Sequence, residues 1–136
     1  MFEMFFEASG YQGPNGDFAL AACTDAKTPS ADTFAFSSLT QVAASGGYSA
    51  MPVERGGAAS GFLITEGDEF ALATLTGNYV LTANASESIS GIKYFVLTDK
   101  NSTEAERELF AYWSIDTPIT ISDGATLTVS ATLQGT

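Results

Sequence analysis

The clearest hydrophobic pattern lies in the C-terminal part of the chain, where several stretches are typical of consecutive β-strands. Residues 91–98 and 108–115 are nearly continuous apolar, β-branched and aromatic runs, which predicts strands buried on both faces. Residues 117–121 and 125–133 instead alternate Thr or Ser with Ile, Leu or Val, so each predicts one apolar and one hydrated face. The Ser-Asp-Gly step at 122–124 is a turn signal. Together they predict part of an antiparallel sheet.

Short strand-like stretches continue through the rest of the chain, with turn residues between them. Five further strand candidates lie at residues 1–8, 17–24, 62–65, 69–75 and 78–83. Strands spaced by about 8–12 residues with turn signals between them are typical of sandwiches and small barrels. We therefore predict an all-β fold, an antiparallel β-sandwich of jelly-roll-like or immunoglobulin-like type with about eight or nine strands. We expect a single domain over residues 1–136, with residues 1–8 as an N-terminal arm.

The N-terminal arm is unusually hydrophobic for the end of a chain. In an extended conformation it places Phe2, Met4 and Phe6 on one face, and Phe5 between two glutamates on the other. A strand with such a face must be covered by other protein. It is either an edge strand of the domain's own sheet or an arm that pairs with a neighbouring subunit. Phe2, Met4 and Phe6 are therefore candidate interface residues.

A second candidate interface lies in the aromatic stretch of residues 108–115. Strand alternation places Phe110 and Tyr112 on one face and Trp113 on the other. Core packing accounts for one of these faces, and the remaining face is a candidate interface. Trp113 is the fourth candidate interface residue.

Composition limits the classes of partner and compartment. The 136 residues carry 16 acidic and 5 basic side chains, and the net charge of −11 argues against binding to nucleic-acid phosphates. No apolar run approaches the roughly 18 residues needed to span a membrane, and the N-terminus lacks the basic region of a signal peptide. The single cysteine, Cys23, lies in an apolar run and is expected to be a small buried side chain.

The residue types offer little catalytic chemistry. The chain has no histidine, which excludes Ser-His-Asp triads and His-ligated zinc. The acidic clusters at 66–69 and 104–108 are expected to be solvated, so a carbohydrate-active enzyme of sandwich fold is the last-ranked class. A calcium loop beginning at Asp99 would need glycine at Glu104 and a carboxylate at Phe110. We therefore predict no enzyme and no catalytic, cofactor-binding or metal-binding residue.

Residues 92–99, 108–113 and 117–128 resemble a recurrent family of small β-rich virion proteins from tailed bacteriophages. The shared features are a strand ending in Asp, a strand with an aliphatic-aromatic centre, and a Thr-Pro-aliphatic-Thr-aliphatic strand followed by a turn containing Gly. These are structural residues, so the resemblance bears on fold more directly than on role.

The resemblance implies a structural protein of the virion, located on the capsid surface. The leading expectation is a capsid decoration, or cement, protein that stabilises the head by bridging capsomers. Its partners would be the major capsid protein and further copies of itself, as a homo-oligomer with a trimer as the expected form. No direct contact with nucleic acid or membrane is expected. The alternative is a tail or fibre component that binds a host receptor through the loops at residues 11–16 and 54–60.

Overall fold

A computed structural model describes residues 18–30, 33, 35–54, 61–66, 71–76, 79–100 and 106–135. Within these residues the chain forms nine β-strands and two single-turn 3-10 helices, which confirms the predicted all-β fold. The strands are β1 (Phe18–Cys23), β2 (Met51–Val53), β3 (Phe62–Glu66), β4 (Ala71–Leu75), β5 (Tyr79–Thr82), β6 (Ile89–Asp99), β7 (Leu109–Ile121), β8 (Thr126–Val129) and β9 (Thr132–Gly135); the helices are η1 (Phe36–Ser38) and η2 (Ser45–Gly47). The strand predicted at residues 1–8 lies outside the described residues.

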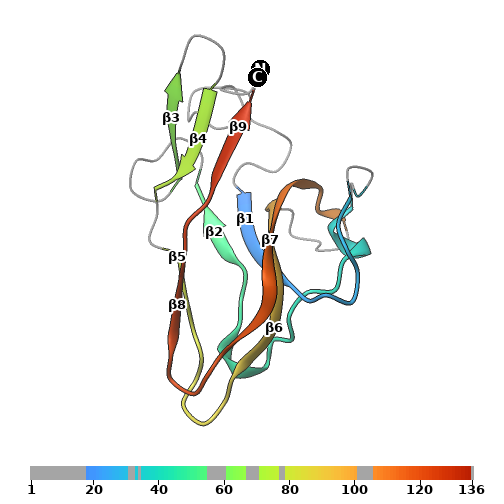
Figure 1. Cartoon of the computed structure of the whole chain (residues 1–136), viewed down its shortest axis with the longest axis vertical. Helices are drawn as coiled ribbons and strands as arrows, with labels where there is room; N and C mark the ends of the chain where they lie inside the picture. The colour runs from blue at the N-terminus through green and yellow to red at the C-terminus, as the bar shows by residue number, and fades with distance from the viewer. Residues whose placement is uncertain are drawn as a thin grey trace.

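The strands form two layers around one main core, as in a β-sandwich (Figure 1). One layer is the antiparallel sheet β2-β1-β6-β7. The other contains β3-β4-β9 and the pair β5-β8. β4 leads into β5 and β8 leads into β9, and the Leu75 N–H donates to the Ala131 carbonyl (2.9 Å) between the two pairings. The two small sheets therefore continue each other as one long, irregular layer.

β1 and β6 are the interior strands of the first sheet, and both are buried. Alternate residues of β1, such as Leu20, face the main core, whereas Cys23 belongs to a second cluster on the opposite side of the sheet. Phe36 of η1 covers that second cluster. The predicted burial of Cys23 and of both faces over most of residues 91–98 is therefore confirmed.

The predicted burial of both faces in residues 108–115 is wrong. β7 is the edge strand of its sheet, and its residues alternate between half-buried and exposed positions. The apolar run gives the right strand but not its place in the sheet, because side-chain pattern does not specify which strands are neighbours.

Three further boundaries differ from the sequence-based expectation. Residues 117–121 continue β7 through an irregularity instead of forming a separate strand. Residues 125–133 divide into β8 and β9, because the chain changes pairing partner from β5 to β4. β2 was not predicted, since it is short and contains Pro52, which is tolerated because β2 is an edge strand.

Tyr48 links the loop after η2 to the central strand β1. Its buried hydroxyl accepts a hydrogen bond from the Ala22 N–H (2.8 Å) and another from Gln41 Nε2 (2.9 Å). The pairing of β1 with β2 ends at Leu20, so the hydroxyl satisfies a backbone donor just beyond that pairing. A buried N–H without an acceptor carries the full cost of its desolvation.

We predict that Tyr48→Phe lowers the free energy of unfolding by about 1–3 kcal/mol, because the Ala22 N–H loses its acceptor. Denaturant unfolding measures this loss. The matched control is Tyr94→Phe, whose hydroxyl makes a long, partly buried bond to Thr28 Oγ1 (3.4 Å) and should cost clearly less. Equal losses in the two variants would contradict the assigned role of Tyr48.

Candidate functional site

The main core is covered less completely on one side of the sandwich. Seven hydrophobic side chains of the described core are only partly buried, and all lie on β7 or on the segment of β8 and β9. They are Ala111, Trp113, Ile115, Ile119, Leu127, Ala131 and Leu133. Among the described residues, β7 pairs only with β6, β8 only with β5, and β9 only with β4. The open side of the sandwich therefore lies between two sheet edges.

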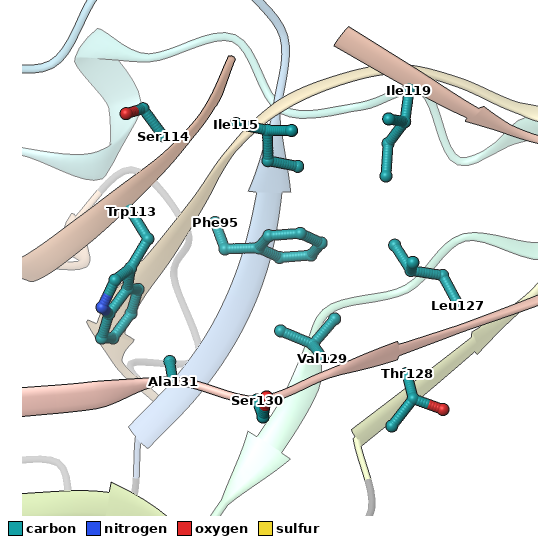
Figure 2. A pocket seen from close by; sticks show the side chains of 10 residues that line it. All are labelled: Phe95, Trp113, Ser114, Ile115, Ile119, Leu127, Thr128, Val129, Ser130 and Ala131. Atoms are coloured by element: carbon teal, nitrogen blue, oxygen red, sulfur yellow. The ribbon is translucent and has the colours of Figure 1, made fainter. Parts of the chain in front are cut away.

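An apolar groove of about 290 Å³ occupies this open side. Figure 2 shows Ile115 and Ile119 from β7, and Leu127 and Val129 from β8, pointing toward the ring of Phe95. The hydroxyl groups of Ser114 and Thr128 point away from the groove, and these residues are exposed. Ser130 also lines the groove, so the lining is mainly, but not entirely, hydrocarbon.

Both ends of the groove are closed by contacts within the chain. At one end, Trp113 Nε1–H donates to the carbonyl of Thr132 (3.3 Å), which joins β7 of one layer to β9 of the other. At the other end lies the turn from β7 to β8, where the Ala125 N–H donates to the Ser122 carbonyl (2.8 Å). The groove therefore opens sideways, between the two strands. Trp113, predicted as an interface residue, lies in its wall.

Lys93 of β6 stabilises the irregular part of β7. Ile92 pairs with Ile119 and Tyr94 with Ser114, so residues 115–118 lie opposite Lys93 alone. The Lys93 ammonium group donates to the carbonyls of Ile115 and of Asp116 (2.8 Å for Asp116), which the β6 backbone does not pair. Ile115 and Ile119 lie on either side of this irregularity, and both point toward the groove (Figure 2).

β7 also carries two exposed aromatic side chains. Phe110 and Tyr112 are 40% and 42% exposed, and they are the only large exposed hydrophobic side chains in the described part of the chain. Tyr112 makes an edge-on contact with Tyr94, at 6.5 Å between ring centroids. Phe110 instead makes an edge-on contact with Phe18 of the main core, at 5.3 Å between ring centroids, because the pairing of β6 with β7 shifts register between Leu97 and Thr98. The predicted alternation is therefore confirmed for Tyr112 and Trp113 and wrong for Phe110.

Of the remaining sequence candidates, some lie among the described residues and others lie outside them. Asp99 is buried, and its Oδ1 accepts a hydrogen bond from the Glu108 N–H (3.0 Å), so it stabilises the start of β7. Phe2, Met4 and Phe6 lie outside the described residues, as do residues 11–16, 55–60, 67–70 and 101–105. The structure therefore places only Trp113 of the four predicted interface residues.

The described residues contain no group of three or more His, Cys, Asp or Glu side chains placed to hold a metal ion. No helix within this part of the chain has the length and apolarity to cross a membrane. Sequence reasoning did not find Phe95, Leu127 and Val129 as groove residues, because the groove forms only where strands of different layers meet.

Comparison of the chain with protein-family models, with curated proteins and with solved structures finds no match.

The surroundings of Tyr79 shift the pKa of its hydroxyl group. Burial in the second layer raises the pKa of Tyr79 above its ordinary value of 10.0, and the negative charge of Glu54 raises this pKa further. Tyr79 does not line the groove. The raised pKa of Tyr79 therefore affects how stability depends on pH, and it does not affect the groove.

We predict that Lys93→Met lowers the free energy of unfolding by about 1–2 kcal/mol, because two carbonyls lose a charged donor. Methionine preserves most of the side-chain length without the charge. Denaturant unfolding gives the loss, and near-ultraviolet circular dichroism of Trp113 reports the groove wall. Lys93→Arg, which restores a charged donor, should recover part of the loss. Unchanged stability in Lys93→Met would contradict this role.

We predict that stability falls as the pH rises above about 10, in part through Tyr79. Below that pH, Tyr79 is protonated in both states; above it, the unfolded state loses the proton first, because its pKa is not raised. Urea unfolding between pH 8 and 11 measures the slope. Tyr79→Phe should reduce the alkaline loss, with Tyr112→Phe as the exposed control. An unchanged slope in Tyr79→Phe would disprove the contribution.

Proposed function

We propose that this chain is a structural protein without enzymatic activity, which binds other protein chains through the groove on its open side. We further propose that it acts in a bacteriophage virion as a capsid decoration protein. The observation that carries the proposal is the apolar groove between two edge strands. Such a site can bind an extended segment of protein, whose backbone pairs with a sheet edge while its side chains enter the groove.

The chemistry of the groove favours a protein segment over a small ligand. Sites for small molecules combine an apolar lining with a few polar groups that fix the ligand's orientation. Here the hydroxyls of Ser114 and Thr128 point away from the interior (Figure 2), which leaves Ser130 as the one other hydroxyl side chain among the lining residues. Natural edge strands are usually protected by charge or proline. Residues 109–115 of β7 carry no charge and no proline, so this part of the edge is suited to pairing.

The resemblance of residues 92–99, 108–113 and 117–128 to phage virion proteins supports the proposed location on the capsid surface. In that setting the protein would bridge capsomers and bind both the major capsid protein and other copies of itself. The excess of acidic residues suits the solvent-facing surface of a many-copy particle, since like charges keep the particles apart.

The proposal predicts that cryo-electron microscopy of the intact virion shows copies of this chain distributed over the icosahedral head. Density confined to the tail would support a tail or fibre component instead. Absence of the chain from the particle would overturn the virion proposal.

A binding assay tests the groove separately from the location. Purified protein is mixed with particles that lack it, and bound protein is measured after sedimentation. Ala131→Asp places a charge in the groove and should weaken binding at least about tenfold, because the charge must be desolvated. The matched control, Ala85→Asp, adds the same charge at an exposed position in the turn between β5 and β6, outside the groove, and should bind like the wild type. Equal binding by both variants would exclude the groove as the contact.

A further inference from the structure

We infer that two copies of this chain join through the edge of β8 that borders the groove, each β8 pairing with the other in antiparallel orientation about a two-fold axis. The inference rests on the proposed function and deepens it by naming a second copy as the partner that covers the groove. Because the contact is two-fold, it yields a dimer, and a trimer would need a different contact.

Alternate residues of β8 direct their backbone groups toward the open side of the sandwich. In an antiparallel ladder, residues that bond to the neighbouring strand alternate with residues whose N–H and carbonyl groups point to the opposite edge. The Ala83 N–H donates to the Ala125 carbonyl (3.0 Å), in the register that pairs β5 with β8, so the odd-numbered residues of β8 point toward β5. The even-numbered residues of this stretch point to the edge beside the groove: Thr126, Thr128 and Ser130.

The start of β9 follows the same alternation. The Leu75 N–H donates to the Ala131 carbonyl (2.9 Å), so the backbone of Ala131 points toward β4. The carbonyl of Thr132 points to the opposite edge, where it accepts the hydrogen bond from Trp113 of β7. This bond shows that the outward carbonyls of this segment face the open side. It also limits the edge that another strand can use to residues 126–130, because the Thr132 carbonyl is already occupied.

β7 borders the same groove but has a more obstructed edge. Lys93 occupies the carbonyls of Ile115 and Asp116. Pro118 has no N–H to donate. The bond from Trp113 to β9 spans the opening beside the preceding part of the strand. Of the two strands at the groove, β8 therefore has the less obstructed edge, and among the described residues it pairs only with β5.

The edge of β8 is complementary to itself. An antiparallel pairing centred on Thr128 places Thr126 opposite Ser130 of the second copy, and the two copies of Thr128 opposite each other. This register is the one in which all the outward backbone groups of residues 126–130 find partners. The side chains directly opposite each other are then Thr with Thr and Thr with Ser, which are favourable cross-strand pairs.

The other face of the paired strands covers the groove. Leu127 and Val129 point toward the ring of Phe95 (Figure 2). In the same register, Leu127 lies opposite Val129 of the second copy, so the two grooves meet at the two-fold axis. Partly buried side chains such as Leu127 and Ile115 are then covered by apolar side chains of the second copy.

Charge limits where two copies of this chain can meet. Each copy has a net charge of −11, and like charges directly opposite each other are destabilising. Residues 124–136 carry no charged side chain, so the edge of β8 can approach its own copy without such a contact. Salt screens the remaining repulsion between the two molecules. Self-association should therefore become tighter as sodium chloride is raised, whereas an association held by ion pairs would weaken.

Sedimentation equilibrium of proline variants tests the inference in the full chain. Thr128→Pro removes an N–H that points away from β5, so the pairing of β5 with β8 is kept and the pairing between copies is lost. We expect dimers of the wild type and self-association at least about 100-fold weaker in Thr128→Pro. The matched control is Thr82→Pro, because Thr82 pairs with Thr126 and its N–H points to the outer edge of β5. This control should associate like the wild type.

Disulfide trapping tests the position of the two-fold axis independently. Cys23 is the only cysteine and is fully buried, so an introduced thiol can be followed without interference. Opposed residues in a hydrogen-bonded antiparallel pair have Cα atoms ~5.5 Å apart, which suits a disulfide. Under mild oxidation, Thr128→Cys should form disulfide-linked dimers on a non-reducing gel. The matched control, Thr82→Cys, is also exposed and should form at least about tenfold fewer.

Three results would overturn the inference. A wild-type protein that stays monomeric at high concentration and high salt would show that the edge of β8 does not pair. Equal self-association of Thr128→Pro and Thr82→Pro would show that the copies meet elsewhere. Equal trapping of Thr128→Cys and Thr82→Cys would exclude a two-fold axis at β8.

These results are separable from a failure of the proposed function. Copies on the viral head without dimers through β8 would retain the decoration role and remove the two-fold contact. Dimers linked through Thr128→Cys, in a protein absent from the head, would retain the two-fold contact and remove the decoration role.

Discussion

The architecture depends on the burial of one apolar core that two unequal layers cover. β1 and β6 are interior strands, so their backbone groups are paired on both sides and their side chains are covered on both faces. This leaves β7 as an edge strand against the segment of β8 and β9, and the partly buried core residues gather along these strands. The groove follows from this arrangement: it is the place where the core reaches the surface.

Two side chains give the open side its shape. Trp113 donates across the layers to Thr132, which fixes the separation of β7 and β9 at one end. Lys93 donates to the carbonyls of Ile115 and Asp116, where β7 departs from regular pairing. A bulge increases local twist and redirects side chains. The charged donor thus stabilises a backbone irregularity between Ile115 and Ile119, both of which point toward the ring of Phe95 (Figure 2).

Sequence pattern predicted the faces of strands better than their neighbours. The apolar run at 91–98 and the alternation of Tyr112 and Trp113 gave correct local structure, because side-chain type reflects burial. The alternation failed at Phe110, where a shift of register turns the side chain toward Phe18. The edge position of β7 and the division of residues 125–133 into β8 and β9 depend on pairing between distant segments, which no local pattern records. Strand alternation was enough to name Trp113 as a candidate interface residue. Phe95 and Val129 could not be identified as groove residues, because the groove forms only where strands of different layers meet.

An exposed, uncharged edge strand is normally a hazard for aggregation, so its limits matter as much as its length. The uncharged stretch of β7 ends at Asp116, and Pro118 follows in the bulge without an N–H to offer. At the other end, Ala35 and Phe36 occupy the positions beside Arg107 and Glu108. The accessible edge is therefore bounded on both sides. A bounded edge limits any added pairing to one short stretch, which is a protection against the continuous pairing that leads to fibres.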